Sequence, residues 1–256
     1  MTSGFAEYFN AVIDWEKRLA REMPLLEEIA SRSGARLLLP ACGTGGHLVA
    51  LALRGFRVFG FDADEDAVAF AQRRIEQEAA RIRAADGEAS VSVMKMEDAA
   101  ELGASHDAAF CLGNALPGIS GEGQLLAALK GVAGALRTGG VLLTQNLNYD
   151  LRWKEKAHWF PLLSGETGKE EVLLVKFAGY EQEIIDFHTL FLVREKGRAK
   201  WKSHARSSRQ APLFRDLLAG LLTQAGFGGL QFWGDYAKSP FDETRSNDLL
   251  AVAEKL

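Results

Sequence analysis

Short apolar runs alternate with amphipathic stretches along the first 150 residues of the chain. The run Leu37–Leu39 contains no polar position, which is typical of a parallel strand buried on both faces. The same criteria predict further strands at 56–61, 90–94, 106–114 (with the strand exit) and 141–145, and helices from about His47, at 65–83 and at 124–136. Strands that alternate with helices in this way predict a doubly wound α/β sheet.

The two ends of the chain follow other patterns. Residues 5–30 carry apolar side chains at helical spacing, and Pro24 predicts that this helix is interrupted and forms two pieces. After residue 150 polar and apolar positions alternate, which predicts antiparallel strands. We expect these strands at 172–177, 183–193 and 199–207, followed by a helix at 212–225 and two last strands at 229–236 and 248–253. Between the core helix and the fifth strand, Arg137 to Gly140 is expected to form a turn in which Gly139 and Gly140 cap the helix.

A glycine-rich turn follows the first buried strand. Three of the four residues Gly43-Thr44-Gly45-Gly46 lack a Cβ atom, so the backbone can bend sharply and approach a ligand closely. Asp62 ends the next strand, about 20 positions after the turn, where an acid in a nucleotide-type βαβ unit accepts hydrogen bonds from ribose hydroxyls. The dinucleotide fingerprint requires a third glycine at the position of Leu48, which argues against an NAD-dependent oxidoreductase.

The phrases Ala41-Cys42-Gly43-Thr44-Gly45 and Val58-x-Gly60-x-Asp62 resemble the class I S-adenosylmethionine-dependent methyltransferases. The resemblance implies a Rossmann-like, mostly parallel seven-stranded sheet with an antiparallel C-terminal edge hairpin and an antiparallel β insertion after strand 5. It implies S-adenosyl-L-methionine as the cofactor, with the glycine turn beside the methionine moiety and Asp62 and Ala63 at the ribose. The chain departs from the family at Leu39, where an acid is usual.

We expect one methyltransferase domain built from four segments. These are an N-terminal helical cap at 1–30, a cofactor-binding core at 31–150, an antiparallel β insertion at 151–208, and a C-terminal helix and strand pair at 209–256.

The same resemblance assigns further cofactor contacts. In similar methyltransferases an N-terminal helix covers the cofactor and a Trp-x-x-Arg pair, here Trp15 and Arg18, reaches its carboxylate. A plain amphipathic helix with Trp15 in the core is an equally good interpretation. Glu97 and Asp98 follow the third strand, where the family commonly binds the adenine amino group, although an exposed acidic loop would look the same.

The sequence Cys111-Leu112-Gly113-Asn114 resembles the glycine N-methyltransferase group in particular. The resemblance implies that Leu112 and Gly113 line the cofactor and that Asn114 touches the substrate next to the methyl group. An Asn-Tyr-Asp segment also occurs in that group after the fifth strand, which adds Tyr149 as a substrate-positioning candidate. Tyr8 is a further candidate, because an aromatic face favours a cationic methyl group.

One strand of the insertion has a basic face. Lys200, Lys202, His204 and Arg206 alternate with uncharged residues, so their side chains share one side of the strand. Such a charge run most often forms a solvent-exposed face without a binding role. If it has a function, Arg206 or Arg209 would bind an anionic group of the substrate as a guanidinium fork.

Composition limits the partners and the compartment. The formal net charge of −4 and a sequence pI of about 5.8 give no general attraction to nucleic acid or to an anionic membrane. The two cysteines and the histidines show no spacing of a disulfide framework or a metal site. There is no secretory signal and no apolar run of membrane length, so a cytoplasmic protein with a small-molecule substrate is expected, and a homo-oligomer is compatible with the sequence.

Methyl transfer from a sulfonium requires mainly that donor and nucleophile are held in line, so no nucleophilic triad is needed. The leading hypothesis is in-line methyl transfer to a small molecule, with the amine of an amino-acid-like compound as the substrate class. One alternative, suggested by the basic strand, is an RNA methyltransferase, but Asn114-Ala115-Leu116-Pro117 lacks the two prolines and aromatic residue typical of base-amino methyltransferases. The other, suggested by Leu39, is a cofactor-binding protein without turnover.

Overall fold

The computed structural model describes residues 4–119 and 121–256. The first three residues of the expected N-terminal cap therefore lie outside the described residues. The helices are α1 (Phe5–Val12), α2 (Trp15–Ser33), α3 (Gly46–Ala52), α4 (Glu65–Ala84), α5 (Glu122–Ala135), α6 (Tyr149–Glu155) and α7 (Arg215–Gln224), with short 3-10 turns η1 (Met96–Leu102) and η2 (Leu116–Gly118). The strands are β1 (Arg36–Pro40), β2 (Arg57–Asp62), β3 (Glu88–Val93), β4 (His106–Cys111), β5 (Leu136–Leu147), β6 (Leu163–Glu166), β7 (Glu170–Glu181), β8 (Ile184–Glu195), β9 (Lys202–Gln210), β10 (Phe227–Trp233) and β11 (Asp248–Lys255).

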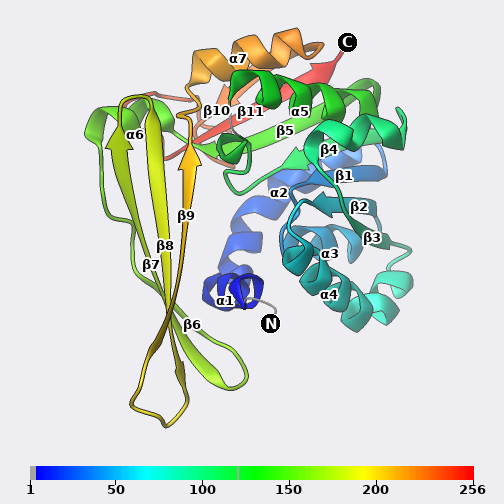
Figure 1. The fold of residues 1–256 in the computed structure, drawn as a ribbon. Coiled ribbons are helices and arrows are strands. Elements are labelled where there is room, and N and C mark those ends of the chain that lie inside the picture. Colours follow the sequence, from blue (N-terminus) through cyan, green and yellow to red (C-terminus); the bar gives the residue numbers. More distant parts are fainter. Residues whose placement is uncertain (1–3, 120) are drawn as a thin grey trace.

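The main sheet has seven strands in the order β10-β11-β5-β4-β1-β2-β3 (Figure 1). The pairs β1–β2, β1–β4, β2–β3 and β4–β5 are parallel. The last two strands, β10 and β11, are antiparallel to each other, and β11 is antiparallel to β5. The predicted fold class, a mostly parallel doubly wound sheet with an antiparallel C-terminal edge, is therefore confirmed.

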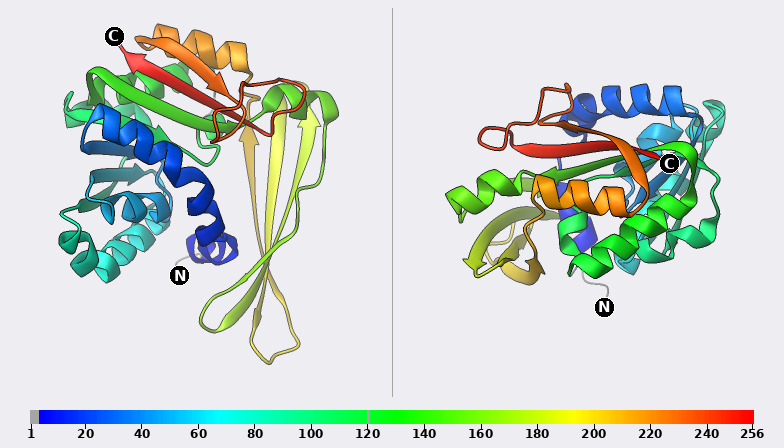
Figure 2. Two further views of the ribbon diagram at one scale, coloured as in Figure 1. Left: turned by 180° about the vertical axis from the view of Figure 1, so that it is seen from behind. Right: turned by 90° about the horizontal axis from the view of Figure 1, so that it is seen from above.

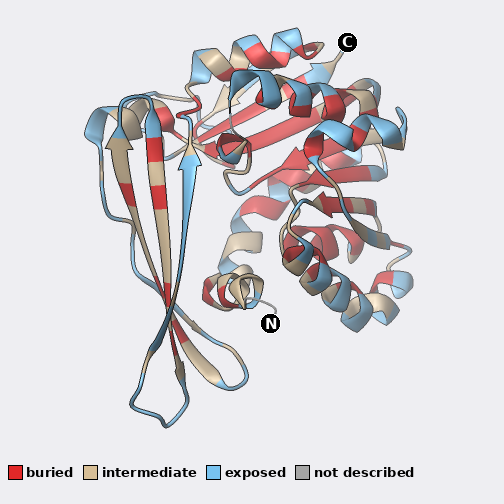
Figure 3. Cartoon of the chain, viewed as in Figure 1, coloured by how far each residue is buried: buried red, intermediate tan, exposed pale blue. Residues whose placement is uncertain are grey.

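Helices cover both faces of this sheet because successive strand residues point to opposite sides. Leu37 and Leu39 of β1 pack with α2, α3 and α4 on one face, whereas Leu38 packs with η1 and α5 on the other. α7 belongs to the same cluster as α5. The central strands are consequently the most buried part of the chain (Figure 3).

The segment between β5 and α7 forms a second, antiparallel sheet in the order β6-β7-β8-β9, as predicted for the insertion. Its long strands stand beside one end of the main sheet (Figures 1 and 2). α1 packs against β6 and β7 on one side and against α4 on the other, with Tyr8 and Val12 buried against Val172 and Phe191. The first helix thus joins the two sheets. β6 and α6 were not expected from the sequence pattern.

The break in the N-terminal helix lies at residues 13 and 14, and the prediction that Pro24 interrupts it was wrong. Ile13 is extended, and the side chain of Asp14 accepts a hydrogen bond from the Lys17 backbone N–H as the N-cap of α2. Pro24 lies inside α2, where the buried neighbours Met23 and Leu25 hold the helix on the sheet. Packing of the apolar face outweighs the missing hydrogen bond.

The predicted glycine cap before the fifth strand was also wrong. Helix α5 ends at Ala135, and Leu136 is already extended and paired with His106. Residues 137–140 form an irregular stretch inside β5, with Gly139 in the left-handed region at a φ of 73°. Arg137 explains this stretch, because its Nε lies 2.7 Å from Asp107 Oδ1 and fixes the loop to β4.

Candidate active site

The glycine turn between β1 and α3 has an unusual backbone. Ala41, Gly43 and Gly45 have φ values of 52°, 54° and 75°, in the left-handed region that glycine adopts most easily. A Cβ at Gly45 would lie 2.8 Å from the Cβ of Ala71, so α4 packs directly on the turn. A Cβ at Gly43, by contrast, would meet no atom within 4 Å. The turn therefore presents bare backbone to an open space at Gly43.

Asp62 is bound to this turn. Its Oδ2 accepts a hydrogen bond of 2.8 Å from the Gly43 backbone N–H, and its Oδ1 accepts one of 3.0 Å from Asp64 N–H. Each carboxylate oxygen keeps one further acceptor position. The acid at the end of β2 is thus held in place and can still accept hydrogen bonds from a ligand.

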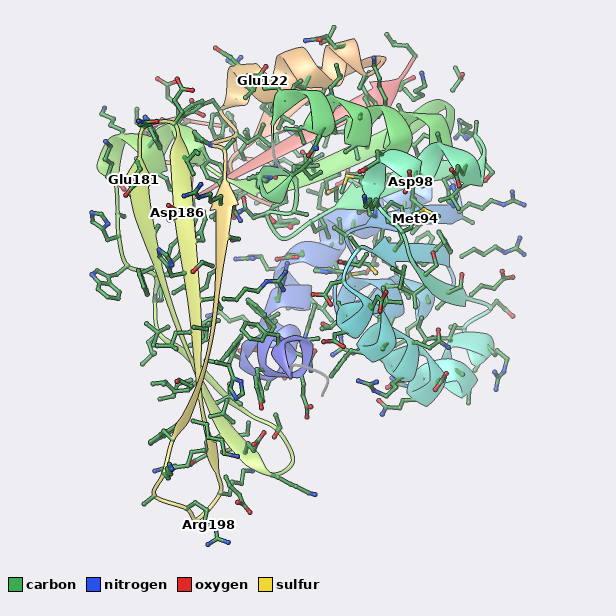
Figure 4. The ribbon with its side chains drawn as sticks, viewed as in Figure 1. Met94, Asp98, Glu122, Glu181, Asp186 and Arg198 are labelled. Atoms are coloured by element: carbon green, nitrogen blue, oxygen red, sulfur yellow. The ribbon has the colours of Figure 1, made fainter. Side chains whose placement is uncertain are left out.

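A cavity of about 380 Å³, here called the glycine-turn cavity, opens in front of these groups. Its lining contains most of the predicted cofactor residues, namely Trp15, Arg18, Ala41, Cys42, Gly43, Thr44, Asp62, Leu112 and Gly113. Gly45 and Ala63 do not line it. Glu97 and Asp98, two exposed residues of η1, do not line it either, and Figure 4 labels Asp98. The structure therefore gathers the glycine turn, α2 and the exit of β4 around one space, without the acids of η1.

Trp15 both packs against the turn and lines the cavity. A Cβ at Gly46 would lie 2.1 Å from its ring, and the indole Nε1 donates a hydrogen bond of 2.8 Å to Asn10 Oδ1. The Arg18 guanidinium lies 5.4 Å from the same ring. The Trp-x-x-Arg pair therefore belongs to the wall of the glycine-turn cavity, and Trp15 is half-buried there rather than part of the core.

A buried ion cluster beneath Arg18 was not predicted. Glu22 is 1% exposed and accepts hydrogen bonds from His47 Nε2 at 2.6 Å, Arg21 at 2.7 Å and Arg18 Nε at 3.2 Å. Burial opposes ionisation of Glu22, but the His47 hydrogen bond and the Arg18 charge outweigh it and lower its pKa to about 2. Burial lowers the pKa of His47, so its imidazole is neutral and donates to the carboxylate. In the sequence, the only sign was an acid on the apolar face of α2.

A second cavity, of about 620 Å³, lies between the main sheet and the second sheet and is here called the second-sheet cavity. It shares Phe5, Phe9, Arg18, Gly113 and Arg206 with the glycine-turn cavity. The two spaces are therefore contiguous, with the exit of β4 and the side chains of α1 at their junction.

Asn114 lies in the second-sheet cavity, directly after that junction. Its φ of 63° is left-handed, and its Oδ1 accepts a hydrogen bond of 2.9 Å from the Leu147 backbone N–H. Its Nδ2 donates to the Tyr149 hydroxyl at 2.9 Å, which in turn donates to Gln210 Oε1 at 2.8 Å. Main-sheet and second-sheet residues together fix the orientation of this amide.

The two tyrosines predicted to touch the substrate line neither cavity. Tyr149 is fully buried behind Asn114, and burial raises the pKa of its phenol. The residue before it, Asn148, caps α6 by accepting a hydrogen bond from Leu151 N–H, so the Asn-Tyr-Asp segment begins a helix. Tyr8 packs against Phe191, with ring centroids 5.7 Å apart. Both phenols occupy supporting positions in the packing.

Only part of the basic strand reaches the site. Arg206 lines both cavities, and its Nη1 lies 3.5 Å from Asp64 Oδ2. Arg209, the other predicted fork, pairs with Asp186 at 3.2 Å. Lys200 and Lys202 line a different hollow together with Arg198, at the far tip of the ribbon in Figure 4. The basic face of β9 is therefore not one continuous binding surface.

Within residues 4–119 and 121–256, no cluster of three or more His, Cys, Asp or Glu side chains has the geometry of a metal site. No helix in that part of the chain has the length and apolarity needed to cross a membrane. Cys42 and Cys111 are free thiols.

Comparison with known proteins gives one matching family model, described as a methyltransferase domain, over residues 38–140. The chain is 25% identical to the glycine/sarcosine N-methyltransferase of Halorhodospira halochloris, over 98% of this chain and 87% of that protein. It is 33% identical to the glycine N-methyltransferase of Oryctolagus cuniculus over 45% of this chain and 41% of that one.

Two solved structures share the fold. An S-adenosylmethionine-dependent methyltransferase from Clostridium acetobutylicum has a TM-score of 0.74 at 14% identity and covers 95% of this chain and 92% of its own. An S-adenosylmethionine-bound amino pentose methyltransferase from Micromonospora echinaspora has a TM-score of 0.67 at 20% identity with the same coverage.

Proposed function

We propose that this chain, which is a class I S-adenosylmethionine-dependent methyltransferase, methylates the amine of a small amino-acid-like molecule. The observation that carries the proposal is the pair of contiguous cavities that meet at Gly113 and Asn114. One cavity is bordered by the glycine turn and Asp62, and the other by the second sheet. The relatives named as glycine and sarcosine N-methyltransferases support an amine as the acceptor.

The residues of the glycine-turn cavity fit the cofactor. The space in front of Gly43 would admit the methionine part against bare backbone, and the remaining acceptor positions of Asp62 would take the ribose hydroxyls. Arg18, held by Glu22, would pair with the cofactor carboxylate. Leu39 is buried and apolar, so it offers the cofactor no polar group. When bound, the cofactor supplies an electrophilic methyl group on a sulfonium.

The chain itself contributes orientation and exclusion of water. Asn114 stands at the junction with its amide fixed by Leu147 and Tyr149, so its position is set before a substrate arrives. Phe5 and Phe9 of α1 line both cavities and add apolar rings to the junction, beside Arg18 and Arg206. The attacking amine must be neutral, and the positive charges of Arg18 and Arg206 favour loss of its proton.

We also propose that the four segments act as one domain. The glycine-turn cavity takes residues from the N-terminal cap, the core and the β insertion, so none of these three holds a complete site by itself. The C-terminal segment joins the core because β11 pairs with β5. The reducing cytoplasm expected from the sequence is consistent with the free thiol of Cys42 in the cavity wall.

Isothermal titration with S-adenosylmethionine, and separately with NAD, tests the cofactor assignment. We expect micromolar binding of the sulfonium compound, no binding of NAD, and a loss of about tenfold or more in affinity for Asp62→Ala, since the ribose hydrogen bonds disappear. Glu101→Ala, an exposed acid on η1, is the matched control and should bind as the wild type does. Absence of binding, or equal binding by Asp62→Ala, would contradict the assigned site.

Release of S-adenosylhomocysteine in the presence of glycine, sarcosine and other small amines tests the acceptor class. Turnover with at least one amine, and with none of the matching alcohols, is the expected result. Tight cofactor binding without turnover on any amine would remove the acceptor proposal and leave the cofactor site intact.

A further inference from the structure

Two cations in the second-sheet cavity have no carboxylate partner. Arg152 projects from α6 and Lys176 from β7, and both line this cavity. The Arg152 guanidinium lies 4.6 Å from the Phe160 ring, and Lys176 Nζ lies 5.3 Å from the same ring, so both charges lie close to one phenyl group. Among the residues that the structure describes, no carboxylate lies within ion-pair distance of either side chain. Arg152 Nε is buried and has no hydrogen-bond partner.

This arrangement is costly for the protein alone. Burial lowers the pKa of Lys176, and the charge of Arg152 lowers it further. Buried charges in proteins are normally paired, because their loss of hydration must be compensated. The other arginines of this cavity obey that rule, since Arg18 and Arg21 pair with Glu22 and Arg206 lies near Asp64. Glu22 is the only carboxylate among the described residues that line the cavity.

The register of the second sheet places a hydroxyl and a further cation beside Lys176. Lys176 of β7 is paired with Thr189 of β8, and Thr189 is paired with Arg206 of β9. All three residues line the second-sheet cavity, so the sheet presents a row of two cations and one hydroxyl on that side. Neighbouring strands are about 4.8 Å apart, which spreads these donors over about 10 Å.

We infer that Arg152 and Lys176, continued by Thr189 and Arg206, form a binding site for an anionic group of the methyl acceptor. The acceptor is then an amine that carries a carboxylate or phosphate, and an amine with two negative charges fits the excess of cations better than one with a single charge. This inference rests on the proposed function, because it names the substrate class of the same site.

The site explains how the acceptor would be oriented. The anionic group binds between α6 and β7, where the guanidinium fork and the ammonium donate hydrogen bonds to it. The amine end then extends along the cavity toward Asn114 and the junction with the glycine-turn cavity. The apolar faces of Phe160 and Phe187 line the same space and exclude water from the charge pairs.

Steady-state methyl transfer with the full-length chain tests the inference. The substrates are an anionic set (glycine, sarcosine, aspartate, glutamate and phosphoethanolamine) and a neutral set (glycinamide and ethanolamine). The variants are Arg152→Gln and Lys176→Met, which keep most of the side-chain volume. Lys154→Met, an exposed lysine on α6 outside the cavity, is the matched control.

For each cavity variant we expect kcat/KM on anionic amines to fall about tenfold or more, mainly through KM, as charge-assisted hydrogen bonds are lost. The cavity variants should keep the wild-type activity on glycinamide and ethanolamine and the wild-type affinity for S-adenosylmethionine. The Lys154→Met variant should behave as the wild type does on every substrate. Comparison of the amino acids with phosphoethanolamine shows whether the site binds a carboxylate or a phosphate. Equal losses on anionic and neutral amines, or no loss on either, would overturn the inference.

A binding measurement keeps the inference testable if no amine is turned over. The protein loaded with S-adenosylhomocysteine is titrated with inorganic phosphate and with succinate, and thermal denaturation confirms that the variants are folded. Binding by the wild type that Lys176→Met removes supports the anion site even if the amine proposal fails. Wild-type protein that binds neither anion would overturn it, whatever the outcome for the cofactor.

Discussion

Replacing Glu22 by Gln should destabilise the protein and remove a defined part of its pH dependence. The substitution keeps the shape of the side chain and deletes the negative charge that His47, Arg21 and Arg18 share. Glu22 itself is buried, so the substitution leaves its partners without the charge they surround, and only the more exposed Arg21 can turn fully to water. We therefore expect a loss of folding free energy together with a loosening of Arg18 at the cavity wall.

The pKa of Glu22 gives the magnitude. A fall from the ordinary value of 4.5 to about 2 corresponds to about 3 kcal/mol of stability at neutral pH. Because the folded pKa is below the unfolded one, this contribution is complete above a pH of about 4.5 and is lost as the pH falls toward 2. The stability difference between wild type and variant should thus be about 3 kcal/mol at pH 7 and about half of that near pH 3. In a chain of this length it corresponds to a fall in Tm of about 6–12 °C.

Urea denaturation followed by tryptophan fluorescence, repeated between pH 7 and pH 3, measures this difference. Glu16→Gln changes an exposed acid of the same helix and should leave stability within about 0.5 kcal/mol of the wild type. A difference for Glu22→Gln that stays constant with pH, or one below about 1 kcal/mol at pH 7, would refute the reasoning that a low pKa stabilises the fold here.

Two further predictions concern the glycine-turn cavity. Gly46→Ala should weaken S-adenosylmethionine binding about tenfold or more in titration calorimetry, because the new Cβ would lie 2.1 Å from the Trp15 ring and must displace it. Gly123→Ala is the control and should bind the cofactor normally, since a Cβ at Gly123 meets no atom within 4 Å. Alkylation of Cys42 by iodoacetamide near pH 8 should be about a thousandfold slower in the folded than in the unfolded protein, because burial and the Asp62 charge raise the pKa of its thiol to about 12. Folded protein that is alkylated at the unfolded rate would contradict the second prediction.

The sequence was most informative where a site is local in the chain. The glycine turn, Asp62 and the strand exit at Leu112 and Gly113 each stand at the end of a buried parallel strand, and such ends meet at one edge of the sheet. Hydrophobic pattern and spacing predicted the α/β sheet, the glycine turn and Asp62, whereas Leu112 and Gly113 were implied by the resemblance to the glycine N-methyltransferase group. Trp15 was suggested only by the resemblance to methyltransferases with a Trp-x-x-Arg pair, and the pattern of α2 alone would also have allowed a core position.

The second cavity depended on contacts between distant segments. Strand register brings Lys176 and Arg206 to one side of the second sheet, and α6 adds Arg152 to the same cavity. No local pattern fixes which face of a β insertion turns toward the main sheet. The Glu22 cluster was missed for a similar reason, since its partner His47 lies 25 residues away. Pro24 misled the helix prediction because packing on the sheet overrides local propensity.

The row formed by Lys176, Thr189 and Arg206 has a consequence for the evolution and redesign of this enzyme. These residues are supplied by an antiparallel ladder that contributes only Arg206 to the wall of the glycine-turn cavity. Each position lines the second-sheet cavity from a paired strand, so one side chain can be exchanged while the ladder and the glycine turn remain intact. If this sheet binds the acceptor as proposed, a new acceptor specificity would be reached by a few substitutions in the second sheet, away from the glycine turn and Asp62.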